Sequence, residues 1–171
     1  MQYDPDIHHR RSIRLRDYDY SQAGAYFITI CSHNRNLLFG DIVNGEMCTN
    51  QIGKIVHDQW KALYQRFPAI ELDEFVVMPN HLHAILVFNQ IEDSAADVTT
   101  IGEIVGAFKS LCVHNCLQWV KDNEPDRFIG KVWQRNYWEH VVRNTREMDN
   151  IRMYIQQNPA KWSTDKLFVP S

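Results

Sequence analysis

The feature that most constrains the fold of this chain is a pair of apolar segments joined by a very short turn. The segments cover residues 75–78 and 82–88, and the turn contains Pro79 and Asn80. β-Branched and aromatic residues favour strands, and a Pro-Asn pair favours a tight turn, so the segments predict a β-hairpin. The chain is therefore expected to build an antiparallel sheet around this hairpin.

The other elements alternate between strands and helices without the regular order of βαβ units. Apolar and β-branched runs predict strands, and apolar residues at helical spacing predict helices. The predicted strands are 25–31, 37–43, a short return strand at 47–48 and 137–143, and the predicted helices are about 50–66, 101–121 and 144–158. We expect an α+β fold with an antiparallel-dominated sheet and helices on one face, in the split βαβ (ferredoxin-like or RRM-like) arrangement.

Length and composition indicate a globular protein with one domain. The chain has 171 residues, 44% of them hydrophobic and 23% charged, which is enough to bury a core. We expect a single domain over 1–171, with a basic N-terminal arm at 1–20, a core at 21–162 and a tail at 163–171. No apolar run approaches the ~20 residues of a membrane span, and no secretory signal is seen, so we expect a cytoplasmic protein with no membrane partner.

Charge is unevenly distributed along the chain. Residues 41–126 carry a net charge of −8, whereas residues 127–166 carry eight Lys and Arg against four Asp and Glu. The N-terminal arm contains Arg10, Arg11, Arg14 and Arg16. This pattern argues against a protein that is basic all over, and it favours one local basic face. The arm is either a solvated tail or a segment that contacts nucleic-acid phosphates.

The clearest candidate for a chemical site is the histidine pair that follows the predicted turn. His81 and His83 are two positions apart on a predicted strand, so both side chains point to one face while Leu82 points to the other. Two imidazoles in this arrangement can reach a single metal ion. The alternative is a pair of unrelated polar residues on a solvent-facing strand edge.

A second candidate lies at the end of the last predicted helix. Tyr154 and Asn158 are four positions apart, so they share a helical face. A phenol becomes a nucleophile when an ion or a base acts on it, and an amide oxygen is a suitable ligand for a hard divalent metal. The alternative is a core tyrosine with an Asn-Pro pair that ends the helix.

Two further groups leave several interpretations open. His140, in the strand predicted at 137–143, is a candidate metal ligand or phosphate contact, or a structural histidine held by a hydrogen bond. Cys112 and Cys116 lie four positions apart and could join the histidine pair in a zinc site. Their place on the apolar face of a helix favours a role in the core.

Four segments occur in an order that is specific to one family. They are YDYSQAGAYF (18–27), VMPNHLHA (77–84), VWQRNYWEHVVR (132–143) and YIQQNPAKW (154–162). Together they resemble the REP-associated tyrosine transposases, which belong to the single-tyrosine, His-hydrophobic-His (HUH) class of transposases that act on single-stranded DNA. The resemblance extends from about Arg10 to Trp162.

The resemblance implies a role for each candidate residue. His81 and His83 would bind Mg²⁺ or Mn²⁺, and Tyr154 would be the nucleophile that forms a 5′-phosphotyrosine link to DNA. Related insertion-sequence transposases have a glutamine ligand four residues after the tyrosine, and Asn158 stands at that position here. The implied activity is cleavage and rejoining of DNA near REP-like hairpins.

The same resemblance implies single-stranded or hairpin DNA as the partner and leaves open whether the active form is a homodimer. The expected phosphate contacts are the four arginines of the arm together with Arg135, Arg143, Arg146 and Arg152. Candidates for stacking on unpaired bases are Phe27, Trp133, Tyr137, Trp138 and Trp162. Two alternatives remain: a non-catalytic module that binds hairpin nucleic acid on the same fold, and a small metal-dependent hydrolase that would not need Tyr154.

Overall fold

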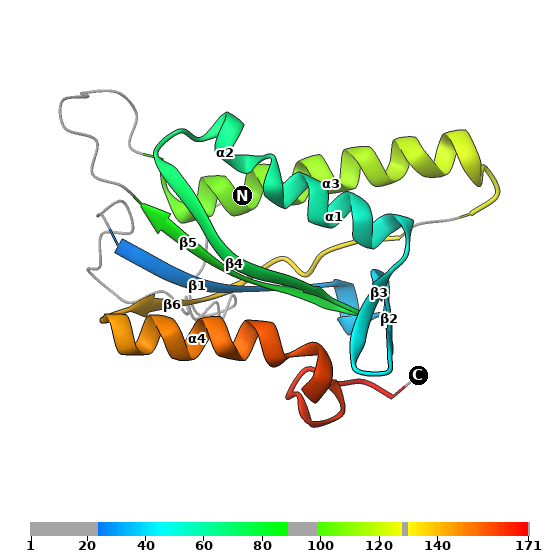
Figure 1. Cartoon of the computed structure of the whole chain (residues 1–171). Helices are drawn as coiled ribbons and strands as arrows, with labels where there is room; N and C mark the ends of the chain where they lie inside the picture. Colours follow the sequence, from blue (N-terminus) through cyan, green and yellow to red (C-terminus); the bar gives the residue numbers. More distant parts are fainter. Residues whose placement is uncertain (1–23, 89–98, 128–129, 171) are drawn as a thin grey trace, which may run out of the picture.

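The computed structural model describes residues 24–88, 99–127 and 130–170 (Figure 1). The strands are β1 (Gly24–Cys31), β2 (Gly40–Val43), β3 (Glu46–Thr49), β4 (Ile70–Met78), β5 (His81–Phe88) and β6 (Trp138–Val142). The helices are α1 (Gln51–Lys61), α2 (Leu63–Arg66), α3 (Ile101–Asn123) and α4 (Thr145–Gln157), with 3-10 helices η1 (His33–Arg35) and η2 (Pro159–Thr164). The main sheet has four strands in the order β4-β5-β1-β6, and β2 pairs with β3 in a separate hairpin.

All pairs in the main sheet are antiparallel, as the sequence predicts. The turn at Pro79 and Asn80 joins β4 to β5, so the predicted central hairpin is confirmed. In β2–β3, Asn44 and Gly45 both adopt positive φ angles, 52° and 80°, which is the backbone geometry of a tight hairpin turn. Within the described residues, the main sheet therefore has β5 and β1 at its centre and β4 and β6 at its edges.

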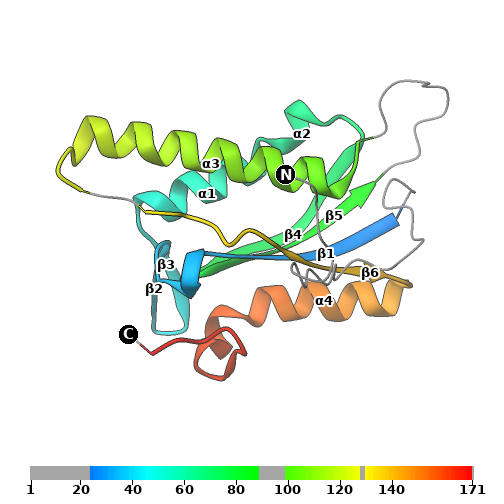
Figure 2. The same cartoon turned by 180° about the vertical axis from the view of Figure 1, so that it is seen from behind.

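Helices cover both faces of the main sheet, and this corrects the expectation of helices on one face. Figures 1 and 2 show α1 and α3 on one side of the sheet and α4 on the other. On the first side, Trp60 and Phe108 belong to the larger buried cluster. On the second side, Ile155 of α4 packs against Phe27 and Ile85 in a smaller cluster. The fold class is otherwise confirmed. The expectation failed because strand side chains point alternately to both faces, and both sets of apolar residues require cover.

Local sequence signals explain where the long helices begin. The Thr100 hydroxyl caps the backbone N–H of Glu103, whose carboxylate returns to the backbone N–H of Thr100, which is a complete capping box for α3. The Asn144 side chain caps α4 by accepting from the backbone N–H of Glu147. Pro159 ends the α-helix as predicted, but the chain continues directly into the 3-10 helix η2. This continuation positions the C-terminal segment next to α4.

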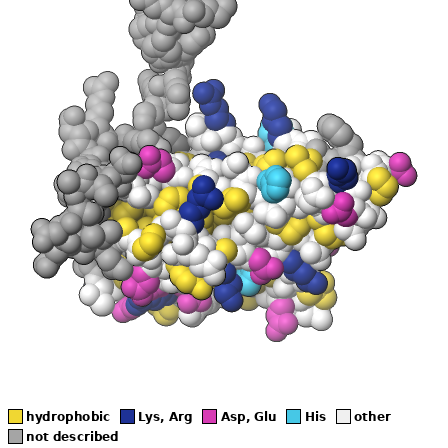
Figure 3. All heavy atoms as spheres, turned by 90° about the horizontal axis from the view of Figure 1, so that it is seen from above, with side chains coloured by type: hydrophobic (Ala, Val, Ile, Leu, Met, Phe, Trp, Pro, Cys, Tyr) yellow, Lys and Arg dark blue, Asp and Glu magenta, His cyan; other side chains and the backbone are white. Residues whose placement is uncertain are grey.

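The face formed by α1, α2 and α3 carries charges of both signs. Figure 3 looks onto this face, and acidic and basic side chains are interspersed among the described residues. No helix in the described part of the chain is both long and apolar enough to cross a membrane. The candidate site described below lies on the opposite face of the sheet, where α4 packs.

Candidate active site

His81 and His83 lie at the start of β5, where they face α4. Their ring centroids are 4.4 Å apart, and their exposed fractions are 0% and 3%. Leu82 points the other way and is buried in the larger core cluster. The predicted same-face arrangement is therefore confirmed. The alternative of a solvent-facing strand edge is wrong, because β5 is a central strand that helix α4 covers.

The Nδ1 atom of each histidine is held by a neighbouring side chain. Nδ1 of His81 lies 2.8 Å from Oδ1 of Asn80, and Nδ1 of His83 lies 2.8 Å from Oγ1 of Thr29. The Asn80 amide donates through Nδ2 to the carbonyls of Leu167 and Arg35, so its Oδ1 is the atom that faces His81. A carbonyl oxygen only accepts, so the proton of His81 is on Nδ1 and the lone pair is on Nε2.

Both imidazoles are neutral at ordinary pH. Burial, followed by the nearby positive charge of Arg35, lowers the pKa of His81 to about 3. Burial and the neighbouring His81 also hold the pKa of His83 well below its usual value. Nε2 of His81 is buried and has no hydrogen-bond partner among the described residues. A neutral imidazole with an unpartnered, buried nitrogen is the state in which histidine binds a metal.

Tyr154, near the end of α4, reaches the histidine pair. Its hydroxyl lies 3.2 Å from Nε2 of His83 and donates to Oδ2 of Asp165, also at 3.2 Å. The side chain is 44% exposed, so the phenol borders both the buried site and the solvent. Burial, followed by the negative charge of Asp165, raises the pKa of Tyr154 to about 12. The phenol is therefore protonated unless a positive charge is placed next to it.

Asn158 shares the helical face of Tyr154, as predicted, and is almost fully buried. Its Nδ2 donates to Oδ2 of Asp165 at 3.0 Å. This contact fixes the orientation of the amide, and Oδ1 is then buried without a partner among the described residues. An orphaned amide oxygen beside a carboxylate and two imidazoles has the properties expected of a metal ligand.

Asp165 is a site residue that the sequence analysis missed. Ligand atoms of His81, His83 and Asp165 all lie within 4.8 Å of one another, which makes them a candidate metal cluster. Asp165 lies in the segment expected to be a tail, but that segment folds back and its Leu167 carbonyl accepts from Asn80. The only sequence signal is an acidic residue shortly after the helix end, and many exposed acidic residues share that property.

Two residues proposed from the sequence have other partners in the structure. His140 forms a hydrogen bond with Glu147 through Nε2 at 2.7 Å, as a structural histidine would, and it is not in the metal cluster found among the described residues. Arg152 forms an ion pair with Asp73 at 2.6 Å and a second with Asp149. Its guanidinium attaches α4 to β4 through the pair with Asp73.

The other predicted residues divide into three groups. Arg135, Arg143 and Arg146 are exposed, and none of them forms an ion pair within the described part of the chain. Cys112 and Cys116 are buried in the core cluster between α3 and the sheet, so they do not join the histidines in a zinc site. The four arginines at 10–16 lie outside the described residues.

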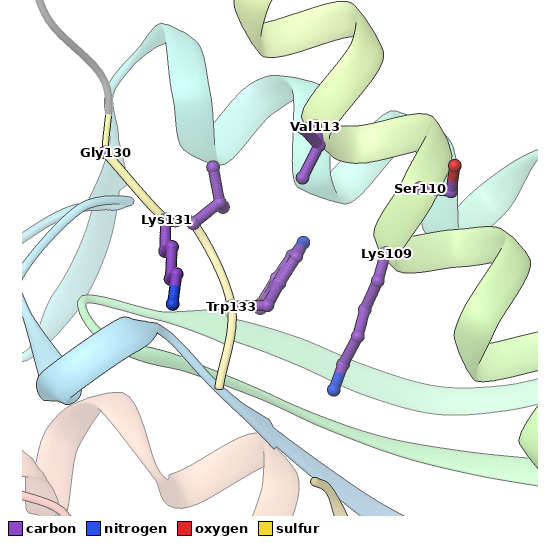
Figure 4. A pocket seen from close by; sticks show the side chains of 7 residues that line it. Lys109, Ser110, Val113, Gly130, Lys131 and Trp133 are labelled. Atoms are coloured by element: carbon purple, nitrogen blue, oxygen red, sulfur yellow. The ribbon is translucent and has the colours of Figure 1, made fainter. Parts of the chain in front are cut away.

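Two hollows differ in their relation to the candidate site. A small cavity of about 110 Å³ lies directly beside the phenol and is lined in part by Tyr154, Asn158, Lys161 and Asp165. A wider and shallower hollow of about 620 Å³ lies near α3, on the opposite side of the sheet (Figure 4). The Lys109 amine that lines the wider hollow donates to the backbone carbonyls of residues 134–136, so it has a structural role. Of these two hollows, the small one is lined by residues of the candidate site, and the wider one is not.

Comparisons with known proteins find relatives of this chain in sequence and in fold. No family model matches the chain. A Haemophilus influenzae protein of uncharacterised function is 40% identical to this chain. The matched region spans 98% of this chain and 97% of the relative. The REP-associated tyrosine transposase of Escherichia coli K12 is 25% identical over 83% of this chain and 70% of its own length.

A solved structure shares the fold. It is a REP-associated tyrosine transposase bound to a REP hairpin, with a TM-score of 0.62 and 22% sequence identity. The match covers 88% of this chain and 74% of that chain.

Proposed function

Because this chain belongs to the family of the REP-associated tyrosine transposases, we propose that it cleaves and rejoins single-stranded DNA near hairpins through a 5′-phosphotyrosine intermediate. The observation that carries the proposal is the position of the Tyr154 hydroxyl, 3.2 Å from Nε2 of His83 and hydrogen-bonded to Asp165. A nucleophile, two neutral imidazoles and a carboxylate that converge in this way are typical of a site for phosphoryl transfer.

The donor atoms fit a divalent metal. His81 and His83 offer two Nε2 atoms, Asp165 offers a carboxylate oxygen and Asn158 offers an orphaned amide oxygen. Carboxylate and amide oxygens suit Mg²⁺ and Mn²⁺, and the imidazoles favour the softer Mn²⁺ of the two. When bound, the ion would supply positive charge that polarises the scissile phosphate and stabilises the phenolate.

The residues of the chain perform the chemical step. Tyr154 gives up its proton, and its oxygen attacks the phosphorus in line with the leaving 3′ oxygen. A new bond forms between the Tyr154 oxygen and phosphorus while the bond from phosphorus to the 3′ oxygen breaks. The 3′ oxygen gains one proton, which balances the proton lost by the phenol. Asp165, which accepts a hydrogen bond from the phenol, is placed to receive that proton first.

Charge and exposure indicate where the DNA backbone lies. The segment 127–166 has a net charge of +4, and its Arg135, Arg143 and Arg146 are exposed and unpaired within the described part of the chain. Helices α1–α3 lie in the acidic segment, on the far side of the sheet from Tyr154. We place the DNA on the side of β6 and α4, with the arginines at 10–16 as additional phosphate contacts.

A cleavage assay tests the proposed function. A hairpin oligonucleotide with single-stranded flanks, labelled at both ends, is incubated with the protein and Mn²⁺ or with EDTA. The proposal expects one fragment with a free 3′ hydroxyl and a second fragment attached to protein, both only with metal. Tight binding without cleavage under either condition would favour the non-catalytic module, and cleavage without any attached fragment would favour a hydrolase.

A further inference from the structure

Trp138 is an exposed aromatic residue on the same face of the sheet as the candidate site. Its side chain is 46% exposed, whereas the other four tryptophans are buried or partly buried. It is the first residue of β6, which is an edge strand of the main sheet among the described residues. The half-exposed indole therefore presents part of a large flat surface to the solvent, beside the candidate site.

The strand register places Trp138 close to the histidines. Trp138 is opposite Thr29 on β1, and Thr29 is opposite His83 on β5, so all three side chains share the face that α4 covers. Neighbouring strands are about 5 Å apart, so the backbones of Trp138 and His83 are about 10 Å apart. Phe27 connects the two regions, because its ring contacts Trp138 at 5.8 Å and Tyr154 at 6.0 Å between centroids.

The orientation of the indole is fixed before any ligand binds. The Trp138 and His140 rings are parallel within 5°, at 5.9 Å between centroids. The His140 ring is in turn held by its 2.7 Å hydrogen bond to Glu147 of α4. A side chain that is already oriented loses less conformational entropy when it binds a flat ligand. This arrangement also gives His140 a role, which is to position Trp138.

The surroundings of Trp138 favour a polyanionic ligand with flat groups. Arg135 lies before β6 and Arg143 lies after it, and both are exposed without an ion pair in the described residues. Proteins that bind single-stranded nucleic acid combine a basic track for the phosphates with aromatic side chains on which bases stack. We propose that Trp138 stacks on an unpaired DNA base next to the phosphate that Tyr154 attacks. This inference rests on the proposed function, since it names a base subsite for the same reaction.

The experiment uses a hairpin oligonucleotide with eight unpaired thymidines on each side of the stem, and a second oligonucleotide in which these positions are abasic. EDTA is present throughout, so that binding is measured without cleavage. The variants are Trp138→Ala, Trp138→Phe and, as a control, Tyr64→Ala, which removes another exposed aromatic side chain from α2 on the opposite face. Affinity and tryptophan fluorescence are measured for each combination.

Wild-type protein is expected to bind the thymidine flanks about 5- to 150-fold more tightly than the abasic flanks, with quenching of its fluorescence. Trp138→Ala should remove most of this preference, Trp138→Phe should keep part of it, and Tyr64→Ala should leave it unchanged. If Trp138→Ala keeps the full preference, or instead turns a dimer into a monomer, the inference is overturned. If wild-type protein binds neither oligonucleotide, the proposed function itself fails.

Discussion

The hydroxyl of Tyr154 lies 3.2 Å from Nε2 of His83, although 71 positions separate the two residues in the sequence. Helix α4 makes this contact by packing across the face of the sheet that contains β5. Two side chains attach it there, because Ile155 is buried against Phe27 and Arg152 pairs with Asp73 of β4. The structure therefore brings the proposed nucleophile and the histidine pair together within one chain.

Replacement of either histidine should abolish metal binding. His81→Ala and His83→Ala each remove one nitrogen ligand, so we expect no saturable Mn²⁺ binding by electron paramagnetic resonance. Both residues are buried, and each deletion also leaves a cavity and an unpaired neighbour. Unfolding should therefore become easier by about 1–3 kcal/mol, with the far-UV spectrum retained. His57→Ala, at an exposed histidine of α1, is the control. Unchanged Mn²⁺ affinity in both variants would remove the histidines from the site.

The hydroxyl of Thr29 should tune the metal site through His83. Its Oγ1 lies 2.8 Å from Nδ1 of His83 and orients the ring. Thr29→Val keeps the shape but removes the oxygen, so we expect Mn²⁺ affinity to fall about 10- to 100-fold. Thr29→Ser keeps the oxygen and should stay close to wild type. Equal Mn²⁺ affinities for the Val and Ser variants would show that the hydrogen bond between Thr29 and His83 does not contribute to metal binding.

The pair between Asp73 and Arg152 should make stability depend on pH. The hydrogen bond from Arg152 holds the pKa of Asp73 below its ordinary value, so the folded state binds the proton less readily than the unfolded state. The stabilisation is complete above about pH 3.9 and is lost as the pH falls through the folded pKa. Asp73→Asn should lower the unfolding free energy by about 1 kcal/mol at pH 7.

Urea unfolding across a range of pH checks this prediction. The difference between wild type and Asp73→Asn should shrink steadily below about pH 4. A difference that stays constant down to pH 2 would mean that the carboxylate charge is not what holds α4 to β4. Asp122→Asn, at an exposed residue of α3 that accepts a hydrogen bond from Gln118, serves as the matched control.

Many elements of the fold follow from local sequence patterns. The face of the sheet on which each helix packs does not follow from them. The Pro79-Asn80 turn is a local signal that lies where it was predicted, and the Asn44-Gly45 turn and the caps at Thr100 and Asn144 are local signals too. The placement of α4 depends on which face of β1 and β5 remains apolar after α3 has packed. This placement is a tertiary property. The sequence identifies Phe27 and Ile85 as residues of buried strands, but it does not show which helix packs against them.

The arginines should differ in what they contribute to DNA binding. Arg143→Ala with Arg146→Ala removes two exposed cations, so the slope of log affinity against log salt for a hairpin oligonucleotide should become shallower by about 1–2. Arg152→Ala breaks the pair with Asp73 and should reduce stability while leaving the slope nearly unchanged. An identical slope in the double variant and the wild type would place the DNA elsewhere.

The sequence predicts those residues of the candidate site that have a regular spacing on one strand or helix. It does not predict the residues that only the tertiary fold brings to the site. The spacing of His81 and His83 on a strand, and of Tyr154 and Asn158 on a helix, is visible in the sequence. Asp165 has no such partner nearby, and only the return of η2 and the following segment brings it to the histidines. For Arg152, the sequence shows a charge but not the Asp73 that neutralises it.

The proposed function requires that Tyr154 forms the covalent bond to DNA. The most direct measurement is mass spectrometry of the protein after reaction with Mn²⁺ and a hairpin oligonucleotide, following nuclease and protease digestion. The account predicts a nucleotide linked to the peptide that contains Tyr154, and no adduct in Tyr154→Phe, which loses one oxygen and still binds the hairpin. A persistent adduct in Tyr154→Phe, or a nucleotide mapped to another tyrosine such as Tyr137 or Tyr26, would contradict it.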